Sequence, residues 1–380
     1  MKVLLIIDHF GPGGAQRQIV ELACGLKRRG HEIEMFVYFP KHDYFRPLIE
    51  EHRIVVHEYT KGRGFSFGVL AKVIELLRRR RFDAAVSYLT SANIYAELAT
   101  LFTRGPSLVV SERTSHHDDR SFASALLKRG LHALSDKVVA NSRSHSDWLK
   151  RKWWLRGKTT AIYNGLNLQK FCPEAGGGEP AGGLHLIAIG RVGPEKNVLN
   201  LIAALGVLQM ESGDAPEVSW VGPRDASNRG RRYCRQIDAM LESMPEVSRR
   251  WHWLGVQTEI PGLLRRHHAL IHPSFYEGLP NVVCEALASG LPVLASNVCD
   301  HPLLVDEGVR GFLFDPESPS SIAAAITRFK ALGDRERQIF SRNAREFAEE
   351  NLGVEKMVSA YESLLLGLQN PASMCIQRRL

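Results

Sequence analysis

The sequence predicts an α/β protein with two doubly wound parallel sheets in separate domains. Short apolar runs, typical of buried parallel strands, alternate with helical stretches along nearly the whole chain of 380 residues. A glycine-rich break at 174–183 interrupts this alternation, which then starts again. A chain of this length usually makes two domains.

The break sets the predicted domain boundaries. We expect residues 1–172 to form the first domain, 173–183 the linker and 184–350 the second domain. Residues 351–380 are predicted to be a C-terminal helix and tail that returns to the first domain. Both domains should be Rossmann-like and face each other across a cleft, with the C-terminal helices packing over both.

The first half opens with a continuous apolar strand at 2–8, a glycine loop at 11–14 and a helix from 15 to about 29. Further strands are predicted at 32–39, 84–88, 108–111 and 137–141, with helices at 67–79 and 121–134. In the second half, strands are predicted at 184–189, 218–221, 252–254, 269–272 and 292–295. A helical tail should run from 320 to 368.

Composition is that of an ordinary soluble protein, with 44% hydrophobic and 24% charged residues. No apolar run approaches the roughly 18 residues of a membrane span, and the first ten residues are too quickly broken for a signal peptide. The six cysteines show no paired spacing, so neither disulfides nor a zinc site is predicted. We therefore expect a cytoplasmic protein.

Positive charge is concentrated in the first half of the chain. Residues 1–170 hold 28 lysines and arginines against 16 acidic residues, a balance of +12, whereas the whole chain carries +8. A basic cluster at 148–156, interleaved with tryptophans, suits peripheral contact with the anionic cytoplasmic face of the inner membrane, with a solvated helix face as the alternative. Further basic clusters stand at 27–29 and 78–81, and a solvated helix face is the favoured interpretation of 78–81. No nucleic-acid-binding signature accompanies them, so a nucleic-acid partner is not expected.

Two glutamates, Glu277 and Glu285, lie eight positions apart around a predicted helix at 281–288. The start of a helix leaves backbone N–H groups unpaired and suits a phosphate. Glu285 lies four residues inside, about 6 Å along the axis, which is on the scale of the step from a phosphate to its ribose. Glu277 stays in the preceding loop. This spacing fits a nucleotide sugar, while an amphipathic helix with two solvated glutamates is the alternative.

The motifs E-G-L-P-N, A-x-A-S-G and P-V-L-A-S stand in one run at 277–296, and here the sequence resembles the retaining glycosyltransferases of family 4, which have the GT-B fold. The resemblance implies that Glu277 contacts the donor sugar and Glu285 the ribose hydroxyls. It also implies that the backbone between them binds the donor phosphates, through Gly278, Leu279, Pro280, Asn281 and Val282.

A second motif, G-R-x-x-x-x-K-N, follows the first strand of the second half. It places Gly190, Arg191 and Lys196 at a strand's carboxyl end, where α/β sheets bind ligands. By resemblance, the two cations clamp the donor diphosphate and neutralise the leaving group electrostatically. Surface ion pairing is the alternative. Because no D-x-D occurs in the chain, we expect no metal and no other cofactor.

The first glycine loop could instead cradle a dinucleotide. Its spacing is G-x-G-G rather than G-x-G-x-x-G, and the end of the second strand offers no acid for a ribose, so an oxidoreductase is not predicted. By resemblance, Gly13, Gly14 and Gln16 approach the donor phosphates, with a plain tight turn as the alternative.

Three further positions complete the predicted site. By resemblance, Glu259 lies near the nucleobase. Many family members carry a histidine after the strand that ends near 111, and Arg113 occupies the corresponding place here. His116 comes three positions later and could reach inward.

Together these features predict a retaining glycosyltransferase. It would move a sugar from a nucleoside diphosphate sugar, UDP-linked by our prediction, to a hydroxyl of a glycan or lipid-linked acceptor. We expect the acceptor to bind in the first domain, 1–172, and the nucleotide sugar in the second, 184–350. The expected setting is bacterial surface polysaccharide or lipid-linked oligosaccharide synthesis. The alternatives are a nucleotide-sugar 2-epimerase of the same fold and a non-catalytic nucleotide-binding protein.

Overall fold

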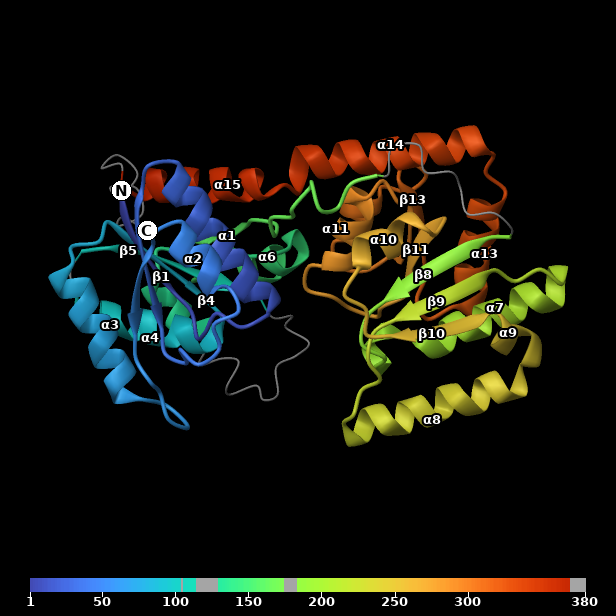
Figure 1. The fold of residues 1–380 in the computed structure, drawn as a ribbon, viewed down its shortest axis with the longest axis horizontal. Coiled ribbons are helices and arrows are strands. Elements are labelled where there is room, and N and C mark those ends of the chain that lie inside the picture. The colour runs from blue at the N-terminus through green and yellow to red at the C-terminus, as the bar shows by residue number, and fades with distance from the viewer. Residues whose placement is uncertain (104, 114–128, 174–182, 370–380) are drawn as a thin grey trace. The chain divides into compact units, whose positions relative to one another are not determined.

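The computed structural model describes residues 1–103, 105–113, 129–173 and 183–369 (Figure 1). Its contacts divide the chain into two compact units: Met1–Gly165 with Val354–Leu380, and Leu166–Gly353. The first crossing between the units therefore comes shortly before the predicted linker, of which 174–182 lie outside the described residues.

The first unit contains a seven-stranded sheet in the order β3-β2-β1-β4-β5-β6-β7, with every neighbouring pair parallel. Its strands are β1 (Lys2–Ile6), β2 (Glu32–Val37), β3 (Val55–Glu58), β4 (Ala84–Tyr88), β5 (Ser107–Glu112), β6 (Lys137–Ala140) and β7 (Thr159–Ala161). The strand order reverses between β1 and β4, which is the ligand-binding switch point of doubly wound sheets.

Helices cover both faces of this sheet. On one face, α1 (Gly14–Arg28), α2 (Arg46–Glu51) and α15 (Val354–Gln369) contribute to a core with alternate strand residues such as Val3 and Leu5. On the other face, α3 (Phe67–Arg79), α4 (Thr90–Thr100) and α6 (Arg143–Lys150) pack on Leu4 and Ile6. The continuous apolar run of β1 is therefore buried on both sides, as expected of a central parallel strand.

The second unit has a six-stranded parallel sheet in the order β10-β9-β8-β11-β12-β13, with its own switch point between β8 and β11. Its strands are β8 (His185–Ile189), β9 (Glu217–Val221), β10 (Trp251–Gly255), β11 (Ala269–His272), β12 (Val293–Ser296) and β13 (Gly311–Phe314). Both units are thus doubly wound, which confirms the predicted fold class.

Eight α-helices accompany this sheet within the described residues, and η3 (Pro194–Lys196) is a 3₁₀ turn after β8. The helices are α7 (Val198–Ser212), α8 (Asn228–Ser243), α9 (Pro245–Arg249), α10 (Ile260–Arg265), α11 (Asn281–Ala288), α12 (His301–Val305), α13 (Pro319–Lys330) and α14 (Asp334–Asn351). Helices α7, α8 and α13 share one core with alternate residues of β8 and β9, while α11 packs against α14.

Most predicted strands are present, but several short elements were missed. Strands β3, β7 and β13, of three or four residues each, were not predicted. The predicted helical tail at 320–368 is present as three helices, with breaks near Gly333 and Gly353. The predicted helix at 121–134 ends as a 3₁₀ turn, η2 (His132–Leu134), and its residues 121–128 lie outside the described part of the chain. No helix in the described ranges is both long and apolar enough to span a membrane.

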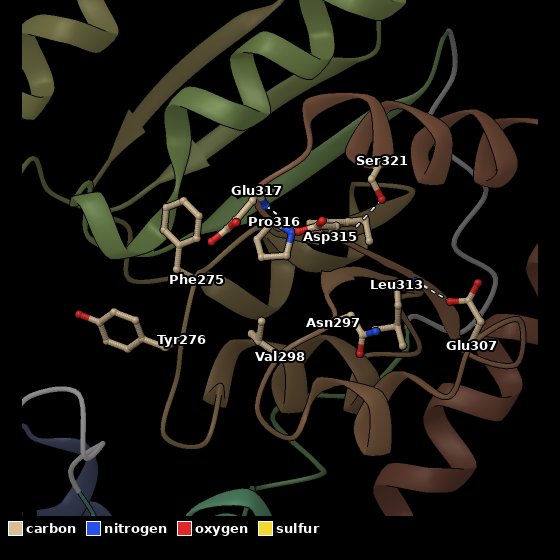
Figure 2. A pocket seen from close by; sticks show the side chains of 11 residues that line it. Phe275, Tyr276, Asn297, Val298, Glu307, Leu313, Asp315, Pro316, Glu317 and Ser321 are labelled. Atoms are coloured by element: carbon tan, nitrogen blue, oxygen red, sulfur yellow. Dashed lines mark hydrogen bonds between the residues drawn. The ribbon is translucent and has the colours of Figure 1, made fainter.

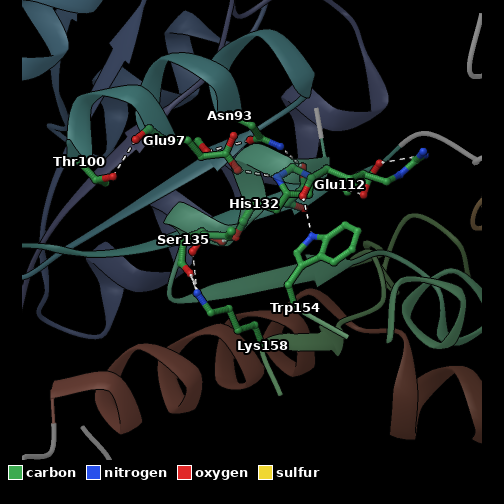
Figure 3. A network of polar contacts seen from close by, with 12 residues as sticks. Asn93, Glu97, Thr100, Glu112, His132, Ser135, Trp154 and Lys158 are labelled. Carbon is green, nitrogen blue, oxygen red and sulfur yellow. Dashed lines mark hydrogen bonds and ion pairs between the residues drawn. The ribbon is translucent and has the colours of Figure 1, made fainter. Parts of the chain in front are cut away.

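A buried polar network lies inside the first unit at the carboxyl end of β5 (Figure 3). The His132 imidazole contacts Glu97 through Nδ1, and its Nε2 lies 3.5 Å from Glu112 Oε2. Arg129 Nη2 lies 3.6 Å from Glu112 Oε1, and His145 Nε2 lies 3.6 Å from Glu112 Oε2. Burial alone would lower the pKa of His132, but hydrogen bonds to Glu112 and Glu97 raise it to about 9.

This network predicts a pH dependence of stability. The ordinary pKa of histidine, 6.5, describes the unfolded chain, so the contribution of His132 is fully present below pH 6.5 and is lost as pH rises through about 9. The loss should be roughly 3 kcal/mol at most. Urea unfolding between pH 6 and 9.5 should show this decline in the wild type and a flatter profile in His132→Gln. The exposed-site variant His42→Gln should keep the wild-type slope; equal slopes in all three proteins would contradict the assignment.

Candidate functional site

The predicted cations of the second unit lie in the loop that leaves β8. Gly190 N–H donates to Val221 O at 2.8 Å, which holds this loop against the one that follows β9. A Cβ at Gly222 would stand 2.2 Å from Gly190 O, so glycine is required for the close approach. The Lys196 side chain passes over Gly190, since a Cβ there would lie 3.2 Å from Lys196 Cε. Gly190 and Lys196 are therefore neighbours in space.

Lys196 and Glu277 form a direct ion pair beyond the ends of β8 and β11. His272, the last residue of β11, contacts the same carboxylate oxygen, with 3.0 Å between its Nε2 and Glu277 Oε1. Glu277 Oε2 has no hydrogen-bond partner among the described residues. The carboxylate is thus held on one side and available on the other.

The charge states in this cluster follow from its burial. Burial lowers the pKa of His272, so a neutral imidazole donates its Nε2–H to Glu277. Although burial alone would raise it, the pKa of Glu277 lies well below its usual range because of the hydrogen bond with His272 and the charge of Lys196. Glu277 is therefore ionised at every physiological pH.

A second histidine supports the first. His301, fully buried, lies 5.2 Å from His272 between ring centroids, in an edge-to-face arrangement. Its Nδ1 is 2.8 Å from Ser296 O, which orients the ring. Burial, followed by the neighbouring His272, lowers the pKa of His301 to about 3, so this imidazole is neutral. Sequence analysis did not identify either histidine.

Helix α11 begins as expected from its sequence. The N–H groups of Val283 and Cys284 donate to Pro280 O, so Asn281 and Val282 precede the first helical hydrogen bonds. Leu279 and Pro280 are buried, while Gly278 is half-buried at the turn. Glu285 lies half-buried one turn into the helix. The predicted order of turn, helix start and second glutamate is present.

Two predicted site residues have local partners. Arg191, with 58% of its side chain exposed, donates from Nη2 to Glu195 Oε1 at 2.8 Å. Glu259 is the N-cap of α10, where its carboxylate accepts the Gly262 N–H at 3.1 Å. This cap accounts for the Glu259 side chain without a ligand.

In the first unit, Gly13 is the N-cap residue of α1 and Gly14 is its first residue. Gln16 is buried and donates from Nε2 to Asp8 Oδ1 at 3.0 Å. Its side chain closes over Gly13, where a Cβ would stand 2.0 Å from Gln16 Oε1. The glycine loop is thus braced by Gln16 at the carboxyl end of β1.

Arg113 is held by contacts inside the first unit. Its guanidinium donates to Ser111 Oγ at 3.0 Å and to Asn164 Oδ1, and it lies 3.9 Å from the centre of the Tyr88 ring. Tyr361 of α15 is a further partner. These contacts join β4, β5 and α15, which is a sufficient structural reason for an arginine here. His116 lies outside the described residues.

Asn197, which sequence analysis also missed, links the loops of the second unit. Buried and at a φ of +57°, it donates from Nδ2 to Pro273 O at 3.1 Å and to Pro316 O at 2.7 Å. Its position directly after Lys196 in the G-R-x-x-x-x-K-N motif was the available signal. Within the described ranges, no group of three or more His, Cys, Asp or Glu side chains is arranged to hold a metal ion.

Comparison with protein families identifies the class of this protein. Residues 175–347 match the family model "Glycosyl transferases group 1", and residues 12–170 match "Glycosyltransferase Family 4". The two matches together cover most of both units. The chain therefore belongs to the family 4 glycosyltransferases and is an enzyme, with the GT-B fold.

Two curated relatives illustrate the similarity. The UDP-Gal:alpha-D-GlcNAc-diphosphoundecaprenol alpha-1,3-galactosyltransferase of Escherichia coli is 24% identical over 315 residues, which are 79% of each chain. The D-inositol 3-phosphate glycosyltransferase of Streptomyces avermitilis is 30% identical over 208 residues, which are 52% of this chain and 45% of the relative.

Among solved structures, Anabaena Alr3699/HepE in complex with UDP superposes with a TM-score of 0.80 at 21% identity, covering 97% of this chain and 100% of that one. At that identity the likeness concerns the fold.

The His272 contact leads to a testable prediction about turnover. His272→Leu removes the N–H that orients Glu277, and hydrogen bonds to charged groups are worth about 1.5–3 kcal/mol, so kcat/KM should fall roughly 10- to 150-fold. His272→Gln, whose amide can still donate, should recover most of this loss. Steady-state kinetics and nucleotide titration on both variants would separate the effects, because nucleotide affinity should be unchanged. Equal activity of the Leu and Gln variants would mean that His272 only fills space.

Proposed function

We propose that this chain is a retaining glycosyltransferase that moves a sugar from a UDP-linked donor to a hydroxyl of a glycan or lipid-linked acceptor. The observation that carries the proposal is the Glu277 carboxylate, held by Lys196 and His272 beside the start of α11. An ionised carboxylate with one oxygen available can accept hydrogen bonds from sugar hydroxyls.

The donor would be bound along α11. Phosphate oxygens would accept from the N–H groups at the start of the helix, which the helix dipole favours. Glu285, one turn further, would accept from two ribose hydroxyls, and Glu277 Oε2 would accept from the transferred sugar. Gly13, Gly14 and Gln16 are proposed to approach the phosphates from the first unit. The cap of α10, beside Glu259, is the proposed base-binding region.

The proposed reaction is front-face substitution. The bond between the anomeric carbon and the β-phosphate oxygen breaks as the acceptor oxygen bonds to that carbon, and the acceptor proton passes to a β-phosphate oxygen. Lys196 and Arg191 would stabilise the charge that develops on the departing diphosphate. The lack of D-x-D in the sequence supports assigning this role to the two cations rather than to a bound metal.

The donor and the setting are inferred from relatives. Anabaena HepE has been solved with UDP, and the E. coli relative is named for a UDP-Gal donor and a diphosphoundecaprenol-linked acceptor. We infer a UDP-sugar donor and an acceptor in surface polysaccharide or lipid-linked oligosaccharide synthesis. A lipid-linked acceptor would require the enzyme to work at a membrane surface.

The first unit offers a surface for such contact. In a βαβ sheet, helices end at the edge where strands begin, so the C-terminal ends of α3, α4 and α6 lie along one edge beside β4, β5 and β7. Arg78 donates to Phe102 O, which joins the first two ends. Trp153, 82% exposed, follows α6. We define this amino-edge patch as the exposed residues Arg78, Arg79, Arg80, Arg81, Leu101, Phe102, Arg151, Trp153 and Arg156.

Two arginines of the patch are ion-paired, Arg79 with Glu75 and Arg80 with Glu34, and so are basic residues elsewhere in the first unit. Arg28 and Arg29, at the end of α1, pair with Glu355, and Arg29 also pairs with Glu362. The amino-edge patch retains positive charge beside exposed apolar rings, a combination that suits anionic lipid headgroups. We propose that the enzyme binds the cytoplasmic face of the inner membrane through this patch.

The donor site is tested with the Glu285 carboxylate. Glu285→Ala should weaken UDP binding by roughly 1.5–3 kcal/mol, because two hydrogen bonds to a charged acceptor are lost. Calorimetric titration would measure this, with Glu350→Gln, an exposed site on α14, as the control. Unchanged UDP affinity in Glu285→Ala would reject the ribose contact.

The proposed reaction is tested with a panel of UDP-sugars in excess chelator. The wild type should release UDP from one member of the panel, and an isomerised sugar product would instead indicate an epimerase.

Membrane binding is tested with vesicles. Each basic residue near an anionic surface contributes about 1 kcal/mol, and screening acts over about 8 Å at physiological ionic strength. Cosedimentation should therefore rise with phosphatidylglycerol content and fall with salt. Arg151→Gln/Trp153→Ala/Arg156→Gln should bind at least tenfold more weakly. Arg335→Gln/Arg342→Gln, at two exposed sites on α14, changes the charge equally and should bind like the wild type. Equal weakening in both variants would point to net charge rather than to the patch.

A further inference from the structure

A pocket of about 1160 Å³ lies in the second unit, at the carboxyl ends of β11, β12 and β13 (Figure 2). Phe275 and Tyr276 come from the loop after β11, Asn297 from the loop after β12, and Asp315 and Glu317 from the loop after β13. None of the residues proposed for donor binding lines it. The pocket nevertheless adjoins Glu277, which follows Tyr276 directly.

The charge of the pocket is negative. Among the lining residues, Glu307 is paired with Arg328 and accepts the Leu313 N–H. Asp315 and Glu317 are exposed, and Asp315 Oδ1 accepts only a backbone N–H, that of Glu317, at 2.9 Å. No lysine or arginine lines the pocket. Two carboxylates without a cation repel phosphate groups, so this pocket does not suit a diphosphate.

The rest of the lining suits a ligand with both apolar faces and hydroxyl groups. Phe275 as a whole residue is 37% exposed, and Figure 2 shows its ring across the pocket from Asn297. An exposed aromatic face offers a surface for the C–H groups of a pyranose ring. Carboxylate and amide oxygens accept hydrogen bonds from hydroxyls, and those to carboxylates are the stronger ones.

The size of the pocket indicates an acceptor glycan rather than the single transferred sugar. A volume of about 1160 Å³ exceeds that of pockets for ordinary drug-sized ligands, whereas the transferred sugar is a single ring held at Glu277. A pocket of this size has room for several linked sugar units. The residues proposed to hold the ribose and phosphates of the donor, Glu285 and 278–282, do not line this pocket, so the donor is assigned elsewhere.

We propose that this pocket binds uncharged sugar units of the acceptor glycan, beyond the unit that receives the transferred sugar. This inference rests on the proposed function, because only a glycosyltransferase has an acceptor glycan to bind. It assigns part of that acceptor to the unit that also holds the donor residues. Phe275 would stack on a ring, while Asp315, Glu317 and Asn297 would accept from its hydroxyls. Such a subsite would select neutral over acidic glycans.

The test uses labelled full-length protein on a glycan array that carries neutral and uronic- or sialic-acid-containing oligosaccharides. The wild type should bind a subset of the neutral glycans and none of their acidic counterparts at the same positions. Phe275→Ala and Asp315→Asn/Glu317→Gln should each lose at least tenfold in affinity for those glycans. Glu350→Gln, the control on α14, should bind like the wild type. Melting temperatures would establish that each variant is folded.

Saturating UDP separates this inference from the proposed function. Glycan binding should persist with UDP present, and UDP affinity by calorimetry should be the same in the wild type and in the pocket variants. Binding to no neutral glycan, survival of binding in Phe275→Ala, or displacement by UDP would each overturn the subsite while leaving the donor site intact. Failure of the wild type to bind UDP or a UDP-sugar would instead reject the proposed function, whatever the array shows.

Discussion

The arrangement of the loops in the second unit depends on two hydrogen bonds from the buried side chain of Asn197. Its amide nitrogen donates to Pro273 O, in the loop after β11, and to Pro316 O, in the loop after β13. Its own backbone has a positive φ, which lets the chain turn from η3 into α7. Because Lys196 precedes it directly, this amide also determines where the lysine stands relative to Glu277.

Lys196 has two roles in its ion pair with Glu277, one in stability and one in the proposed reaction. The lysine neutralises a mostly buried carboxylate, which would otherwise be costly to ionise. In the proposed reaction the same ammonium also faces the diphosphate, so its charge would be shared between carboxylate and leaving group. His272 is neutral because of its burial, and its hydrogen bond would hold Glu277 in place as the charge of Lys196 turns toward the departing diphosphate. His301 and Ser296 form the layer behind it, since His301 bonds to Ser296 and packs on His272.

Charge is divided sharply between neighbouring surfaces of the second unit. Arg191 and Lys196 follow β8, whereas Asp315 and Glu317 follow β13, three strands away in the same sheet. The middle of this carboxyl edge therefore favours phosphates, and its β13 end disfavours them. In the first unit, the positive charge is similarly uneven, because α15 supplies Glu355 and Glu362 to the end of α1, whereas no ion pair among the described residues involves Arg151 or Arg156.

The sequence alone determined the fold class, the order of the longer elements and the family, because these depend on local patterns. The apolar run at 2–8, the glycine loop before α1 and the E-G-L-P-N segment before α11 can each be recognised without knowing what they pack against. Glu277, Lys196 and Glu285 were singled out in the same way.

Only the tertiary structure brought His272 to Glu277, His301 to His272, and Asn197 to Pro316. Two of these contacts join residues that are far apart in the chain, and the third depends on the path of the loop between β11 and Glu277. A single His or Asn carries no local signal of its partner. The structure also decided that Glu259 caps α10 and that Arg113 binds Asn164, since a side chain's partner depends on which loops the sheet brings together.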